Sequence, residues 1–201
     1  PSQRVSRGVL RFLTFQTLGM PFILYTGWML SGVEVGSPQA ALMTRSALLL
    51  GLGFAFLLAV FPFHTWILMV MEEANPFPAV FVLFMLTLIV PLFGLSFLDR
   101  YEWLRSSSTL YGVFAITGVL MALIGGTSAA FEHHLGRVFG YVILIEIGYS
   151  FLAISFAGEM GLGLFISLLI PRMVSFGIWA LDLTLLRSYR GGLNFHSLRG
   201  V

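Results

Sequence analysis

Three ionisable residues lie inside long apolar stretches of the sequence: Glu146, Arg172 and Asp182. Placing such a group in a membrane-spanning helix costs roughly 2.5–3.5 kcal/mol on insertion scales, so each needs a partner, a cavity or a function. A low-dielectric medium favours the protonated form of a carboxyl group, and a nearby arginine favours the ionised form. Arginine itself keeps its proton, so it acts on the carboxyl group only through the electrostatic field of its positive charge. A carboxylate beside a movable arginine can therefore load and release a proton.

The spacing of these residues indicates how they pair. The stretches Val138–Ala157 and Leu162–Leu186 are joined by a short connection, Gly158–Gly161, which predicts an antiparallel helical hairpin. Glu146 precedes this turn by about as many residues as Arg172 follows it, so both reach a similar depth at about 1.5 Å of rise per residue. We expect them to form one buried ion pair near the membrane centre.

The same count places Arg137 opposite Asp182 near the cytoplasmic end of the hairpin. For both pairs the alternative to a functional role is a structural one, in which the ion pair only holds two helices together. For Glu146 the functional interpretation is favoured, because a partly polar stripe that water can follow lies at helical spacings from it, comprising Tyr149, Ser150 and Ala153.

A second group of candidate residues surrounds several prolines. Phe61-Pro62-Phe63-His64-Thr65-Trp66 is followed by Glu72-Glu73-Ala74-Asn75-Pro76-Phe77-Pro78. Proline interrupts a helix, and membranes tolerate the break where it borders protein or water. His64 beside such a break can exchange protons near neutral pH, and Glu72 and Glu73 are further proton-pathway candidates. An interfacial cap anchored by Trp66 is the alternative. His133-His134 predicts a solvated loop pair, and its spacing indicates no metal site.

The composition places these groups in a membrane. Hydrophobic residues make up 58% and charged residues 10% of the sequence, with a mean hydropathy of +0.94, whereas soluble proteins average about 25% charged residues. A spanning helix needs about 20 apolar residues. We expect about six such spans, at Phe12–Leu30, Ser46–Met71, Phe77–Leu98, Leu110–Ala130, Val138–Ala157 and Leu162–Leu186. Because apolar residues run continuously and do not alternate, the expected fold class is all-α, a polytopic transmembrane helical bundle.

The arginines predict the orientation of this bundle. Six crossings place both chain ends, the Glu72 loop and the Arg137 loop on one side. That side collects seven arginines (Arg4, Arg7, Arg11, Arg137, Arg187, Arg190 and Arg199), and the other side has three (Arg45, Arg100 and Arg105). By the positive-inside rule, the richer side faces the cytoplasm or its equivalent.

Two residue types are missing altogether. The absence of cysteine excludes a disulfide framework, a thiolate nucleophile and an Fe–S cluster within this sequence. Lysine is also absent, and the scattered arginines form no basic face, so nucleic acid is not an expected partner. The sequence opens at Pro1 with no signal peptide and has polar ends, so we expect residues 1–201 to be one transmembrane domain within a longer protein.

Several of these segments, in this order, resemble a known family: the antiporter-like, proton-translocating membrane subunits of respiratory complex I (NADH–quinone oxidoreductase) and the related Mrp-type cation/proton antiporters. The family's P-F-H-x-W segment, acidic residue and P-x-P turn are similar to Pro62-Phe63-His64-Thr65-Trp66, Glu72-Glu73 and Pro76-Phe77-Pro78. Its later segment is similar to Arg137-Val138-Phe139-Gly140-Tyr141 with Gly148-Tyr149, and its linker to Gly191-Gly192-Leu193 through Leu198-Arg199-Gly200.

The departures from the family concern its proton-relay lysines. Relatives commonly carry one lysine a turn or two before the P-F-H segment, where this sequence has Phe56-Leu57-Leu58, and another directly before the arginine matched by Arg137, where it has Gly136. The proline and aspartate that usually follow the tryptophan are replaced by Leu68 and Met69. Neither relay lysine is therefore present.

The resemblance implies part of an inverted-repeat, antiporter-like fold. It implies a membrane-arm subunit of a complex-I-type NADH–quinone oxidoreductase that couples proton translocation to electron transfer, without a redox centre or cofactor of its own. The implied partners are other membrane-arm subunits, the lipid bilayer and redox subunits at a distance. The implied location is an energy-transducing membrane, namely the bacterial cytoplasmic membrane. A non-conducting structural spacer subunit and a stand-alone cation/proton antiporter are the alternatives.

Overall fold

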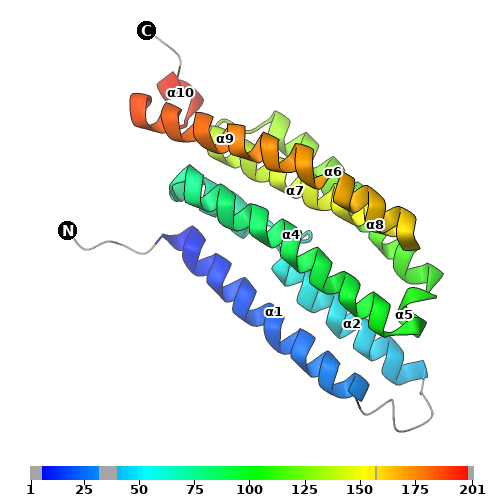
Figure 1. The fold of residues 1–201 in the computed structure, drawn as a ribbon. Coiled ribbons are helices and arrows are strands. Elements are labelled where there is room, and N and C mark those ends of the chain that lie inside the picture. The colour runs from blue at the N-terminus through cyan, green and yellow to red at the C-terminus, as the bar shows by residue number, and fades with distance from the viewer. Residues whose placement is uncertain (1–5, 32–39, 157, 199–201) are drawn as a thin grey trace.

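The computed structural model describes residues 6–31, 40–156 and 158–198, and this part of the chain is a bundle of helices (Figure 1). Its only β-type contact is an isolated bridge between His134 and Asn194. The described helices are α1 (Arg7–Ser31), α2 (Ala40–Leu57), α3 (Thr65–Glu73), α4 (Pro76–Arg100), α5 (Glu102–Arg105), α6 (Ser108–Ala130), α7 (Leu135–Ser155), α8 (Gly158–Ser167), α9 (Leu169–Arg190) and α10 (Phe195–Leu198). The predicted all-α membrane bundle is confirmed.

Four helical segments of the described chain are long and apolar enough to cross a membrane. They are α4, α6, α7 and the 33-residue stretch Gly158–Arg190 formed by α8 and α9. These four match the last four predicted spans. Helix α1, with 25 residues, is long enough to cross a membrane, but it is more polar than these four segments and includes Gln16. Helix α2 is shorter than they are, so neither helix is among the four.

The predicted span Ser46–Met71 is divided in two by a non-helical stretch, residues 58–64. Pro62 cannot donate a backbone hydrogen bond, and Ala59 has a left-handed backbone with φ of 52°, so the helix stops after Leu57. The carbonyl of Leu57 consequently lacks its helical partner. The side chain of Gln16 on α1 donates to this carbonyl at 3.2 Å. A polar residue in α1 thus stabilises the break in its neighbour.

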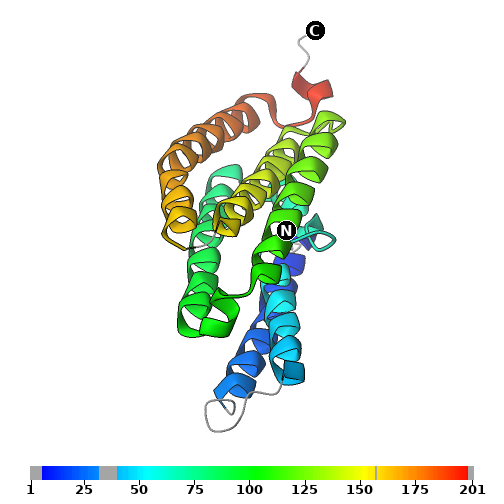
Figure 2. The same cartoon turned by 90° about the vertical axis from the view of Figure 1, so that its right-hand side faces the viewer.

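The second bend lies in the longest span, where α8 gives way to α9 at Leu168 (Figure 2). Pro171 has no N–H to donate to the carbonyl of Ser167 four residues earlier, so the regular hydrogen-bond ladder is interrupted there. Helix α8 packs on α7, whereas α9 packs mainly on α4. The bend therefore carries the last helix from one neighbour to another.

Helix α7 is the centre of the bundle, and it contacts α3, α4, α6, α8 and α9. Its closest neighbour is α6, where glycines allow backbone contact. A Cβ atom on Gly118 would lie 2.7 Å from the carbonyl oxygen of Gly148, and a Cβ on Gly148 would lie 2.8 Å from that of Gly118. Small residues at such crossings permit the close approach that stabilises helix pairs in membranes.

The side-by-side arrangement of helix ends agrees with the predicted topology. The start of α1, the end of α3, the start of α7 and the end of α9 gather at one end of the bundle (Figure 1). The predicted common side for the Glu72 loop, the Arg137 loop and the end of the last span is therefore confirmed, and we call it the proximal end. The opposite end, which holds α5, is the distal end.

We predict that Gly118→Leu destabilises the protein by about 1–3 kcal/mol, since the new side chain meets backbone that cannot move aside without separating α6 from α7. Thermal unfolding in detergent measures the effect. Gly126→Leu on the same helix is the matched control, because a Cβ there meets nothing within 4 Å. Equal stability of the two variants would contradict the prediction.

Candidate functional site

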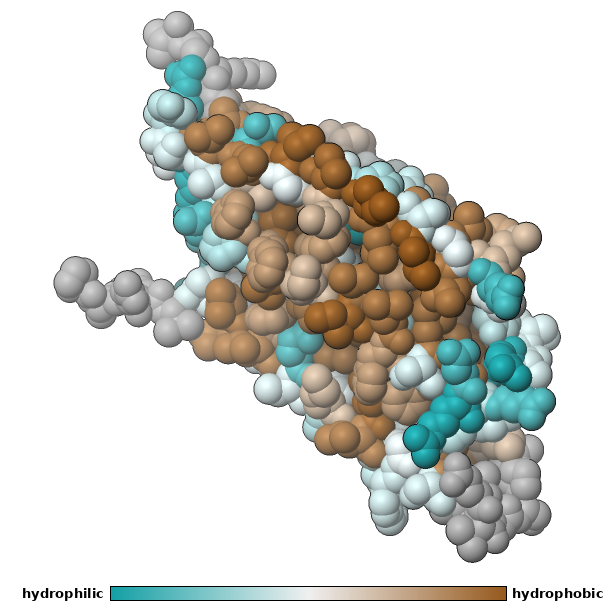
Figure 3. All heavy atoms as spheres, viewed as in Figure 1, coloured by the Kyte–Doolittle hydropathy of each residue, from teal (hydrophilic) through white to brown (hydrophobic). Residues whose placement is uncertain are grey.

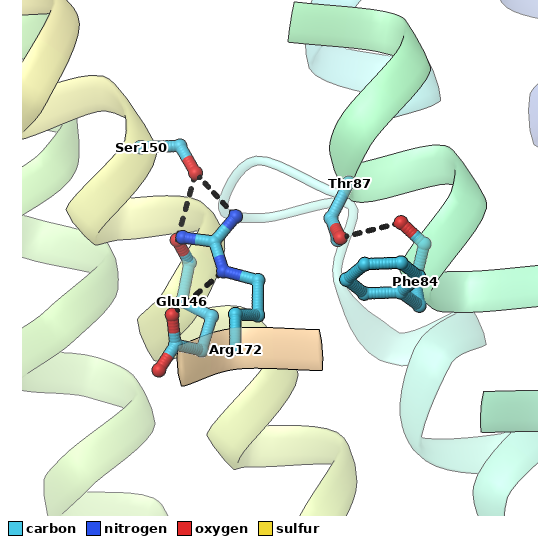
Figure 4. A network of polar contacts seen from close by, with 5 residues as sticks. All are labelled: Phe84, Thr87, Glu146, Ser150 and Arg172. Atoms are coloured by element: carbon cyan, nitrogen blue, oxygen red, sulfur yellow. Dashed lines mark hydrogen bonds and ion pairs between the residues drawn. The ribbon is translucent and has the colours of Figure 1, made fainter. Parts of the chain in front are cut away.

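Arg172 and Glu146 form an ion pair in the interior of the bundle (Figure 4). Arg172 Nε donates to Glu146 Oε2 at 2.9 Å, Nη2 donates to the backbone carbonyl of Glu146 at 3.0 Å, and Nη1 donates to the Ser150 hydroxyl at 3.0 Å. Only 1% of the Arg172 side chain is exposed. The pairing predicted from the hairpin register is confirmed.

The two helices position these groups through simple spacing. Ser150 follows Glu146 by one helical turn on α7, and its hydroxyl also donates to the Glu146 carbonyl at 3.0 Å. Arg172 lies in the first turn of α9, directly after Pro171 and the bend at Leu168. The guanidinium therefore enters the bundle at the point where α9 turns from α7 toward α4.

The two oxygens of the Glu146 carboxylate differ in their hydrogen bonding. One oxygen accepts from Arg172, and within the described chain no hydrogen bond is made by the other oxygen. The side chain is 25% exposed, whereas its partner is fully buried. The buried guanidinium of Arg172 is therefore paired with a carboxylate that reaches the surface of the bundle. At that surface the Glu146 carboxylate can exchange a proton with water or with a group on a neighbouring helix.

An aromatic cluster lies next to this pair on the proximal side. Phe176, one turn after Arg172 on α9, packs edge-to-face on Phe84 of α4 and Phe139 of α7, with ring centroids 6.0 and 5.2 Å apart. Trp179 stacks on Phe139 at 5.4 Å. Phe139 and Phe176 are almost completely buried. These four rings, the aromatic layer, separate the ion pair from the polar groups at the proximal end.

Arg137 pairs with glutamates at the proximal end and not with Asp182, so that prediction is wrong. Its Nε lies 3.2 Å from Glu132 Oε2 and 3.9 Å from Glu72 Oε2. Both contacts are ion pairs, and Nε donates no hydrogen bond to either carboxylate. Asp182 is exposed, and within the described residues it has no ion pair. The bend before α9 explains the difference, because the register persists but α9 moves away from α7 toward α4.

His134 is the N-terminal cap of α7 and not the fully solvated loop residue that we predicted. It is half-buried, and its Nδ1 accepts from the backbone N–H of Arg137 at 3.4 Å. Burial lowers the pKa of His134, although the nearby carboxylates of Glu72 and Glu132 oppose the shift. A lowered pKa favours the neutral ring, which is the form that can accept this hydrogen bond. His133 is exposed, as predicted.

Glu73 fastens the start of α1 to the end of α3. Its carboxylate accepts from the backbone N–H of Gly8 at 3.0 Å and from the Ser6 hydroxyl. These hydrogen bonds, with that of Gly8 the largest contribution, lower the pKa of Glu73. Arg187 at the end of α9 donates to the backbone carbonyls of Ala74 and Glu73. Three helices thus meet at the last turn of α3.

His64 and Tyr149 lie apart from the ion pair. His64 occupies the N-cap position of α3 without a capping hydrogen bond from its side chain, and it stacks on Phe61 at a ring-centroid distance of 5.6 Å. No hydrogen bond or ion pair in the described chain links it to Glu146 or Arg172. Tyr149 is 44% exposed on α7, whereas Ser150 and Ala153 are buried, so the predicted stripe does not form one continuous surface.

Sequence reasoning left two interacting residues, Glu132 and Arg187, out of the candidate set. It placed Ser150 in the polar stripe from its four-residue spacing to Glu146, but it did not predict the hydrogen bond that Ser150 accepts from Arg172. Arg187 carried no usable signal, because its contact with Ala74 joins segments that are distant in the chain. Glu132, in contrast, precedes its partner Arg137 by only five residues.

The apolar spans, the buried ion pair and the helical bundle define an integral, multi-pass membrane protein. The sequence profile of the family described as NADH:quinone oxidoreductase/Mrp antiporter, transmembrane, matches residues 9–196, and the chain belongs to this family. Neither the search of curated proteins nor that of solved structures found a match.

We predict that Glu146→Leu costs roughly 3–5 kcal/mol of stability, because it leaves the buried Arg172 without a counter-charge. Glu146→Gln should cost less, since its amide oxygen can still accept from Nε. Chemical unfolding in detergent measures both. The double variant Glu146→Leu/Arg172→Met is the control, because it removes both charges, and it should be more stable than Glu146→Leu. If the double variant is the less stable of the two, the stranded charge does not explain the loss.

We also predict that acidification loosens the start of α1. The pKa of Glu73 is lowered in the folded protein, so its stabilising effect is complete above the usual carboxyl pKa of 4.5 and is lost as the pH falls through the lowered value. Hydrogen exchange of the Gly8 amide should therefore accelerate in acid relative to the intrinsic rate. In Glu73→Gln the protection should be independent of pH, and in Glu72→Gln it should behave as in the wild type.

Proposed function

We propose that this protein is a membrane subunit of a complex-I-type NADH–quinone oxidoreductase and takes part in proton translocation coupled to electron transfer. The observation that supports this function is the ion pair of a fully buried Arg172 with a partly exposed Glu146. Membership of the NADH:quinone oxidoreductase/Mrp antiporter family supplies the setting.

The proposed chemistry assigns different tasks to the two residues. Arg172 keeps its charge at every working pH, so Glu146 is the group that exchanges a proton. While Arg172 Nε donates to the carboxylate, the ionised acid is favoured, and withdrawal of the guanidinium favours protonation in the low-dielectric interior. Rotation at the bend beside Pro171 is the movement that separates them. Arg172 is thus a positioning residue that controls when Glu146 accepts its proton.

The proximal polar groups serve as the entrance to this pathway. Glu72, Glu73, Arg137 and His64 were candidates on sequence grounds, and in this proposal the Arg137–Glu72–Glu132 contacts collect protons from the aqueous side. Tyr149 lies at the exposed surface of α7 near Glu146. The aromatic layer is a barrier between entrance and carboxylate that opens when α9 moves.

The proposed assembly follows from the family. Neighbouring membrane-arm subunits and lipid surround the bundle, and redox subunits at a distance hold the electron carriers, so this subunit needs no cofactor. Residues 1–201 form one transmembrane domain of a longer antiporter-like subunit. The proposed location is an energy-transducing membrane, the bacterial cytoplasmic membrane.

A structural spacer subunit is the second candidate, and one observation favours it. Lysine is absent, and Gly136, which stands where relatives commonly carry lysine, packs against α3 so closely that a Cβ would overlap the Met71 carbonyl oxygen. No longer side chain fits at that position without separating α3 from α7. This packing favours a spacer that does not conduct, and the proton-translocating function that we propose depends on Glu146 instead.

We predict that Glu146→Gln, which keeps the hydrogen bond to Arg172 but cannot titrate, lowers proton pumping per electron by half or more while assembly is preserved. The measurement uses the intact complex reconstituted in vesicles. Glu159→Gln in the first turn of α8 is the control, since this exposed glutamate has no ion pair in the described chain. If Glu146→Gln pumps at the wild-type ratio, Glu146 is only a structural partner of Arg172, and the spacer function is the better one.

A further inference from the structure

A pocket of about 360 Å³ opens at the distal end, between the last turns of α1 and α4. It is lined by Gly27 and Ser31 of α1 and by Phe93, Ser96, Phe97, Arg100 and Tyr101 in and after α4. The pocket lies at the opposite end from the contacts of Arg137 with Glu72 and Glu132. Its lining residues come from α1 and from α4 with the residue that follows it, whereas Glu146 and Arg172 lie on α7 and α9, so the pocket belongs to neither site.

Arg100 supplies the only formal charge among the lining residues. Within the described chain its guanidinium has no hydrogen bond or ion pair, although Asp99 and Glu102 are its near neighbours in sequence. Its planar set of N–H donors matches the oxygens of a phosphate group. The pocket therefore offers an unused cation to a ligand of net negative charge.

The two serines add acceptors to this donor. The Ser31 hydroxyl donates to the Trp28 carbonyl at 2.7 Å, and the Ser96 hydroxyl donates to the Phe93 carbonyl at 2.6 Å. Because each hydroxyl hydrogen is committed to its own helix, the serine oxygens can only accept from a ligand. A ligand that carries hydroxyl groups beside its anion satisfies them.

The surroundings place the pocket at the boundary between hydrocarbon and water. Phe93 and Phe97 form apolar walls on the side of the span, and an exposed pair on α1, Tyr25 and Trp28, lies with ring centroids 5.7 Å apart. Tyrosine and tryptophan gather at the headgroup level of membranes. Figure 3 shows polar surface gathered at this end of the molecule, beyond the apolar side chains of the spanning helices.

We infer that this pocket binds an anionic phospholipid with a polyol headgroup, of the phosphatidylglycerol class, in the distal leaflet. Arg100 donates to the phosphodiester oxygens, Ser31 and Ser96 accept from headgroup hydroxyls, and the phenylalanines contact the start of the acyl chains. The site goes beyond the proposed proton translocation, since none of its residues belongs to the Glu146 site.

Native mass spectrometry of the purified protein, titrated with phosphatidylglycerol and separately with phosphatidylcholine, tests the site. Both lipids carry the phosphodiester, but phosphatidylcholine also carries a cation that Arg100 repels and has no hydroxyl group for the two serines. We therefore expect the first phosphatidylglycerol to bind at least about tenfold more tightly than phosphatidylcholine, and Arg100→Gln to reduce this difference severalfold. Arg45→Gln and Arg105→Gln each remove an exposed distal arginine outside the pocket and should change binding less than twofold.

Two further arms separate the alternatives. The wild type should prefer phosphatidylglycerol to phosphatidic acid, which lacks the headgroup hydroxyls, and the double variant Ser31→Ala/Ser96→Ala should lose this preference. Inorganic phosphate should not displace the bound lipid. The inference is overturned if all three arginine variants lose affinity equally, which indicates a general surface effect, or if inorganic phosphate competes, which indicates a site for the free anion.

Discussion

A guanidinium that cannot give up its proton lies almost entirely out of water at Arg172, and the structure around it depends on neutralising that charge. Glu146 and Ser150 provide three acceptors from one face of α7, so α7 must present this face to α9 at one depth only. The ion pair therefore sets the register of the two central spans, which packing of apolar side chains alone would leave free to slide.

Backbone contact complements this electrostatic constraint. Gly118 and Gly148 bring α6 onto α7, and Gly136 brings α3 onto the start of α7, so the central helix is held on two sides without intervening side chains. The contact at Gly136 also leaves no room for a longer side chain at this position. The close packing of the broken helix against α7 thus depends on a glycine there, and the only carboxylate in the buried ion pair comes from Glu146 on α7.

The sequence predicted those features that depend on spacing along the chain. The Glu146–Arg172 pair followed from a short turn between two apolar stretches, and the break before His64 followed from Pro62. The pairing of Arg137 with Asp182 failed because Pro171 bends the last span, and counting residues gives depth but not lateral distance. The contacts of Arg187 with Ala74 and of Glu73 with Gly8 were beyond prediction, since each joins segments 65 or more residues apart whose meeting depends on the whole bundle.

The bend at Leu168 gives the last span the mechanics of a lever. Arg172 lies close to the fulcrum, and Arg187, which holds the carbonyls at the end of α3, lies about 28 Å from the fulcrum at 1.5 Å per residue. A rotation of about 5° at the fulcrum would displace Arg187 by roughly 2.5 Å, enough to break its hydrogen bonds. Torque applied at the aqueous end would in turn reach the buried ion pair as a much smaller displacement, so a single helix links the contacts at one surface mechanically to the ion pair in the interior.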